Sequence, residues 1–245
     1  MNAVLLAALT SISTSLGGLF TLRTKDRFHL VLGLSAGLLL GLVAFDLNPV
    51  IYSQNGITWG GLPAVPVAFC AGFLLLHFVE KWVGGHEGHS HHYEDEHTHS
   101  EHVAGLFGAV AMAGHVFMDG VALGVAFHVS HALGVAVFFA LLVHAFSDGL
   151  NTVAMLVKAG SWSQKGISLL AIDAVVRISG AIIGNSFNLS QGSINIYLGF
   201  FSGFVIYIAT SHILPEAHAS HPSRFTMATT ALGVAIMWVV IRTLG

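Results

Sequence analysis

Two copies of the pattern His-x-x-x-Asp-Gly supply residues that could bind a metal ion. One copy begins at His115 and the other at His144, each within a long apolar segment. A histidine and an aspartate four residues apart lie on the same face of a helix. Two such faces, opposed across a pair of helices, offer two imidazole nitrogens and two carboxylates to one divalent ion. We therefore predict a main metal site made of His115, Asp119, His144 and Asp148.

The kinds of ligand limit which metal this site would hold. Mixed nitrogen and oxygen ligands suit Zn²⁺, Fe²⁺, Mn²⁺, Co²⁺ or Ni²⁺, and the lack of a thiolate argues against Cu⁺. Cys70 is the only cysteine of the chain, which excludes an intrachain disulfide and a cysteine-based zinc site. The simpler alternative is that the four side chains only form hydrogen bonds between helices. Ionisable groups at membrane depth are costly and usually serve function, so we favour the metal.

The composition indicates an all-α integral membrane protein. Of the 245 residues, 54% are apolar and only 9% are charged, whereas soluble domains carry about 25% charged residues. The chain should therefore lie in a lipid bilayer, where a helix satisfies its own backbone hydrogen bonds. A formal net charge of −3 argues against a nucleic-acid partner.

Eight segments are long and apolar enough to cross a membrane as helices, and they make one transmembrane domain of residues 1–245. They cover approximately residues 2–22, 29–50, 58–83, 103–127, 132–157, 166–187, 194–213 and 225–244.

The basic residues between these segments predict the orientation, because cytoplasmic loops are enriched in Lys and Arg. With the N-terminus outside, the outer side receives only Arg242. The inner side then receives Arg23, Lys25, Arg27, Lys81, Lys158, Lys165 and Arg224. We therefore expect both termini outside. The compact chain, without a recognisable targeting extension, also leads us to expect the cytoplasmic (plasma) membrane as the location.

A short repeat links the second and the seventh segment. Three positions have a counterpart 166 residues later: Gly37 with Gly203, Asp46 with His212, and Pro49 with Pro215. The predicted topology makes the two segments run in opposite directions, so the repeat is inverted and relates helices 1–3 to helices 6–8 around the metal-binding pair 4–5. Inverted repeats are common in secondary transporters.

Polar residues near the segment ends are candidates for entry and exit of the ion. The outer group consists of Asp46, His128 and His131. The inner group consists of His212, Glu216, His218 and His221. Ordinary interfacial polar residues are the alternative for both groups.

One segment, residues 84–102, is clearly polar and should be a cytoplasmic loop. Its histidines are His86, His89, His91, His92, His97, His99 and His102. They could buffer or sense metal locally, or the loop could be a solvated linker that transport does not need.

Taken together, these features resemble the ZIP family of metal transporters. The matching features are the eight spans, the histidine-rich loop after the third, the His-x-x-x-acid-Gly motifs in the fourth and fifth, and the Leu-Pro-Glu ending of the seventh at residues 214–216. The resemblance implies uptake of a divalent metal ion into the cytoplasm. It makes Zn²⁺ the first expectation for the cargo and a homodimer a plausible assembly, with no catalytic cofactor and no enzymatic activity.

The motifs also depart from that family. Many bacterial members have Glu in place of Asp119 and Asp148, and members with a two-metal centre carry polar ligands where this chain has Val116 and Ala145. We therefore expect one metal ion in the main site.

A charged pair in the sixth segment bears on the same question. Asp173 and Arg177 lie on one helix face at a spacing of four. They could simply neutralise each other, or Arg177 could replace a second cation beside Asp119 and Asp148.

Two other functions would use similar residues. An intramembrane zinc hydrolase needs three protein ligands and an open position for water, but it requires neither an inverted repeat nor a histidine-rich loop. A nickel/cobalt permease of another family is a closer alternative, although its leading motif spaces His and Asp differently.

Overall fold

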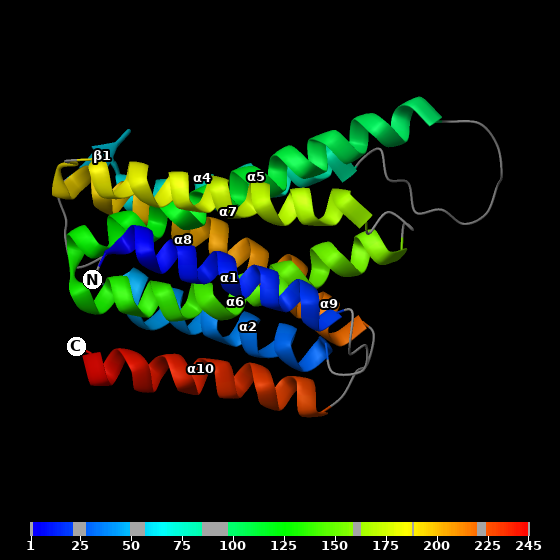
Figure 1. The fold of residues 1–245 in the computed structure, drawn as a ribbon. Helices are drawn as coiled ribbons and strands as arrows, with labels where there is room; N and C mark the ends of the chain where they lie inside the picture. The colour runs from blue at the N-terminus through cyan, green and yellow to red at the C-terminus, as the bar shows by residue number, and fades with distance from the viewer. Residues whose placement is uncertain are drawn as a thin grey trace.

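The computed structural model describes residues 2–21, 28–49, 57–84, 98–158, 163–187, 189–219 and 224–244. Within these ranges eight long helices lie side by side as a bundle (Figure 1). They are α1 (Ala3–Thr21), α2 (Phe28–Leu42), α4 (Ala64–Gly84), α5 (Thr98–Val129), α6 (His131–Lys158), α7 (Ser163–Ser186), α8 (Gln191–Tyr207) and α10 (Arg224–Leu244). Two π-helices, η1 (Val43–Leu47) and η2 (Ile208–Ile213), extend α2 and α8, and the short helix α9 (Leu214–Ala219) follows η2.

This architecture confirms the predicted all-α, multi-pass membrane fold. Six helices of the described part of the chain are long and apolar enough to cross a bilayer, and α4 and α5 contribute the shorter apolar stretches Ala64–Val79 and Ala113–Val129. Both termini lie at the same end of the bundle (Figure 1), as an even number of crossings requires.

Two predicted boundaries were wrong. The third segment was expected to be helical from residue 58, but a hairpin of β1 (Thr58–Trp59) and β2 (Leu62–Pro63) precedes α4. Gly60 and Gly61 form its two-residue turn with φ of 59° and 83°, values that glycine adopts without strain and that favour a tight hairpin. Both ends of the predicted polar loop 84–102 are helical, because Gly84 belongs to α4 and α5 already begins at Thr98, while residues 85–97 lie outside the described residues.

The packing of the helices follows the inverted repeat. Helix α2 lies along α10 and α8 along α4, while α1 lies along α6 and α7 along α5. Helix α2 runs toward the end that carries both termini, and α8 runs away from it (Figure 1). A Cβ at Gly37 would overlap the carbonyl oxygen of Thr230 on α10, and one at Gly203 would overlap that of Phe69 on α4. The two related glycines therefore permit the same close approach of helices.

The π-helices also occur at related positions. The amide of Asn48 donates to the carbonyl of Val43, and the amide of Leu214 donates to that of Ala209, so both bonds span five residues. The two bonds lie 166 residues apart, which is the offset of the sequence repeat. Each is followed by a proline, which lacks the amide hydrogen that would continue the helical bonding.

The apolar core lies between α2, α5, α6 and α8. It includes Leu39, Leu123, Leu141 and Phe201, which are all almost completely buried. By contrast, α7 and α10 turn many apolar side chains outward, including Val175 and Phe225. Helices α5 and α6, which carry the two motifs, are thus held in the centre of the bundle.

Candidate metal centre

The short connection between α5 and α6 brings the two motifs to the same depth. Only Ser130 separates the helices, and its hydroxyl accepts a hydrogen bond of 3.0 Å from the amide of Leu133, which caps α6. His115 lies fourteen residues before the end of α5 and His144 thirteen residues after the start of α6, which correspond to about 21 Å and about 20 Å of helix. Antiparallel helices therefore place both histidines side by side.

The four predicted ligands converge in the structure. The Nε2 atoms of His115 and His144 are 3.0 Å apart. His115 Nε2 lies 3.6 Å from the Oδ2 atom of Asp119 and 3.9 Å from that of Asp148. His144 Nε2 lies 3.5 Å from Asp148 Oδ1. One ligand atom from each of the four residues lies within 4.8 Å of all the others, and each residue is at most 8% exposed.

These separations match the size of a tetrahedral metal site. Zinc binds nitrogen and oxygen at about 2.0–2.2 Å, so two ligand atoms of a tetrahedron lie about 3.3–3.6 Å apart. The measured distances of 3.0–3.9 Å bracket that value. The whole set lies within 4.8 Å, so the most distant ligand atoms would have to move closer together before all four could bind one ion.

The glycine that ends each motif sets how closely the next helix approaches. A Cβ at Gly120 would overlap the carbonyl oxygen of Arg177 on α7. A Cβ at Gly149 would overlap the carbonyl oxygen of Thr14 on α1. The two aspartates are thus each followed by a point of backbone contact, and the motif glycines serve packing rather than ligation.

Because of this close approach, the side chain of Arg177 reaches the predicted ligands. Its Nη1 atom lies 3.3 Å from Asp119 Oδ2. Its Nη2 atom lies 3.6 Å from Asp148 Oδ2 and 3.6 Å from Asp173 Oδ1, one turn earlier on α7. Arg177 is 1% exposed. The residues of the predicted charged pair therefore border the site, and Arg177 contacts three carboxylates rather than one.

Two aromatic residues of α8 also contact this region, and the sequence analysis missed both. The ring of Phe204 stacks on His115 with 5.5 Å between centroids and an interplanar angle of 21°. The hydroxyl of Tyr197 donates to the backbone carbonyl of Met118, next to Asp119, at 3.1 Å. No local pattern marks them, because aromatic residues within apolar helices usually pack against lipid or core.

The predicted outer residues lie apart from the four-ligand cluster. His128 is exposed, and its Nε2 atom lies 3.0 Å from the backbone carbonyl oxygen of Asn185. The exposed ring of His131 meets the edge of Phe127. Asp46 lies on η1 and is half-buried. The connection between α5 and α6 lies at the end of the bundle that carries both termini (Figure 1).

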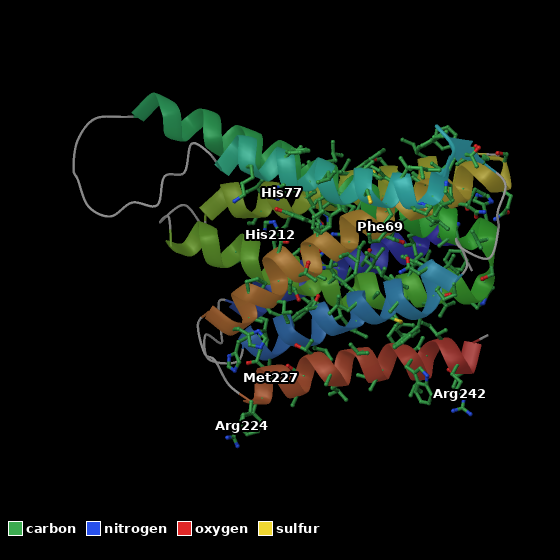
Figure 2. All side chains as sticks on the ribbon, turned by 180° about the vertical axis from the view of Figure 1, so that it is seen from behind. Phe69, His77, His212, Arg224, Met227 and Arg242 are labelled. Carbon is green, nitrogen blue, oxygen red and sulfur yellow. The ribbon has the colours of Figure 1, made fainter. Side chains whose placement is uncertain are left out.

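Among the predicted inner residues, His212 is on η2, where its ring lies 5.6 Å from that of Tyr207. The hydroxyl of Tyr207 lies 3.3 Å from Nδ1 of His77 on α4. Figure 2 labels His77 and His212. His218 Nδ1 lies 2.8 Å from the carbonyl oxygen of Leu214 within α9. Glu216 belongs to the same short helix.

Several predicted residues cannot be placed further. His221 lies outside the described residues, as do His86, His89, His91, His92 and His97. His99 and His102 belong to the first turns of α5.

Comparisons with known proteins identify relatives of the chain. Residues 83–241, more than half of the chain, match the family described as ZIP Zinc transporter. The chain is 27% identical to Zinc transporter YKE4 of Saccharomyces cerevisiae, over 90% of this chain and 72% of that protein. It is 28% identical to Zinc transporter zipt-7.1 of Caenorhabditis briggsae, over 72% of this chain and 56% of that protein. It is 32% identical to Zinc transporter foi of Drosophila melanogaster over 51% of this chain, which is 18% of that longer protein.

Proposed function

Because the chain belongs to the ZIP zinc transporter family, we propose that it carries divalent transition-metal ions across the membrane through the cluster of His115, Asp119, His144 and Asp148. This is a family of membrane transporters and not of enzymes. The observation that supports this most is the convergence of four ligand atoms within 4.8 Å in the middle of the bundle. Family membership sets aside both the hydrolase and the nickel/cobalt permease of another family.

Zn²⁺ is the proposed cargo, because two imidazoles and two carboxylates at these distances suit a tetrahedral ion. Fe²⁺, Mn²⁺ and Co²⁺ accept similar ligands and are the competing ions. The names of the three relatives, each called a zinc transporter, support zinc.

Transport is proposed to run into the cytoplasm, with both termini outside and the protein in the plasma membrane. The excess of basic residues on the inner side supports this orientation. An ion would then pass Asp46, His128 and His131 on entry, and His212, Glu216, His218 and His221 on exit. The histidines of residues 86–102 would buffer metal on the inner side, and the protein would work as a homodimer.

Uptake into proteoliposomes tests the proposal. Vesicles loaded with a fluorescent indicator of divalent metals would contain wild type, His144→Ala, Asp148→Ala or no protein. Zn²⁺, Fe²⁺, Mn²⁺ and Co²⁺ would be added in turn. We expect wild-type uptake with Zn²⁺ favoured, and loss of uptake in both variants. Uptake by folded His144→Ala and Asp148→Ala at the wild-type rate would refute the role of this site.

A further inference from the structure

Arg177 is the one cation of the described residues that borders the metal cluster, and the transport site does not account for it. We propose that its guanidinium is a built-in cation that limits the site to one divalent ion at a time. This inference rests on the proposed function, because it concerns the number of ions that the same site accepts.

The contacts of Arg177 support the proposal first. Its two terminal nitrogens lie 3.3 Å from Asp119 and 3.6 Å from each of Asp148 and Asp173. Asp119 and Asp148 are also the predicted carboxylate ligands, so the guanidinium and the ion would share them. Positive charge placed among three carboxylates occupies the position that a second cation would otherwise seek.

The formal charges lead to the same conclusion. Three carboxylates and one guanidinium leave a charge of −2 around two neutral imidazoles. One divalent ion neutralises this cluster, whereas a second would leave an uncompensated charge of +2 inside the bundle. Uncompensated charge in a low-dielectric interior is strongly unfavourable.

Helix packing alone does not require this charged pair. The backbone carbonyl of Arg177 on α7 lies against Gly120, and the backbone carbonyl of Thr14 on α1 lies against Gly149. Since Gly120 and Gly149 end the two related motifs, Thr14 is the counterpart of Arg177 in the inverted repeat. Thr10 likewise precedes Thr14 by four residues, as Asp173 precedes Arg177. Both threonines are buried and donate to backbone carbonyls of α1. Because a backbone carbonyl oxygen makes the contact at both glycines and the residue on α1 has a neutral side chain, this contact does not require the charge of Arg177.

The number of bound ions tests the proposal. Full-length wild type, Arg177→Gln, Arg177→Lys and the double variant Arg177→Gln/Asp173→Asn would be purified in detergent and titrated with Zn²⁺. The number of Zn²⁺ ions bound by each protein would be compared with the number bound by the same protein after His144→Ala and Asp148→Ala. Zinc held by other histidines is then subtracted, and the difference counts only the ions in the cluster. The double variant keeps the formal charge of −2, since it loses one positive and one negative group.

We expect wild type, Arg177→Lys and the double variant each to bind one Zn²⁺ per chain more than the matching protein that carries His144→Ala and Asp148→Ala. Arg177→Gln should bind two more. One Zn²⁺ in folded Arg177→Gln, or two in wild type, would overturn the inference and leave the transport site standing. If Arg177→Gln does not fold, the double variant decides alone. It should bind one Zn²⁺ within about tenfold of the wild-type Kd, and loss of that binding would overturn the inference. No Zn²⁺ in the wild-type cluster would instead contradict the proposed function.

Discussion

Replacing His144 by alanine would remove one of the four proposed ligand atoms and should leave the helix intact. Tetrahedral zinc sites bind with about 10–16 kcal/mol in total, so an equal share per ligand is about 2.5–4 kcal/mol. Since each 1.4 kcal/mol changes Kd tenfold, about two to three orders of magnitude in affinity should be lost. His115→Ala should lose a similar amount, because both Nε2 atoms border the same space at 3.0 Å from each other.

The assay is equilibrium competition for Zn²⁺ between the purified protein and an indicator of known affinity. His29→Ala on α2 is the matched control, since His29 is not part of the four-ligand cluster, and its Kd should stay within about threefold of wild type, less than 1.4 kcal/mol. The same Kd in His144→Ala and His29→Ala would contradict the role of His144 as a ligand. In that case the close approach of the two imidazoles would be only a hydrogen bond between helices.

Three further outcomes are expected. Phe204→Leu should weaken Zn²⁺ binding by up to about tenfold, because stacking that orients His115 is worth about 0.5–1.5 kcal/mol. The control is Phe139→Leu, because Phe139 is 45% exposed. Gly203→Ala should lower the melting temperature in detergent, because overpacking costs about 1–3 kcal/mol, whereas Gly114→Ala should not, since no atom lies within 4 Å of a Cβ there. Deletion of residues 86–97 should leave proteoliposome uptake of Zn²⁺ intact, and abolished uptake would show that this segment takes part in transport.

The four predicted ligands could be found from the sequence because their spacing carries the geometry. Two residues four apart share a helix face, and a repeat of the pattern on the next helix makes the faces meet. The π-helices were not predicted, but they occur at positions related by the 166-residue offset of Pro49 and Pro215. The spacing within a helix and the repeats along a chain can both be seen in a single sequence.

The rest depends on contacts between distant helices. Phe204 differs from other apolar residues of α8 only in what it faces, which is the ring of His115. The reach of Arg177 to Asp119 depends on the backbone contact at Gly120. The hairpin before α4 was missed for another reason: its residues Trp59 and Leu62 are apolar, and composition outweighed the turn signal of the two glycines between them.

The inverted repeat gives both ends of the bundle the same backbone but different donor groups. Helix α2 ends in a π-helix that carries Asp46, and α8 ends in one that carries His212 and runs the opposite way (Figure 1). A π-helix followed by proline leaves backbone carbonyls with fewer helical partners, and such segments often occur at functional sites. A carboxylate attracts any cation, whereas an imidazole prefers transition metals. At the related positions of the two π-helices an ion would therefore meet a carboxylate at one end and an imidazole at the other, while His128 and His131 beside Asp46 and Glu216 beside His212 give each end both kinds of donor.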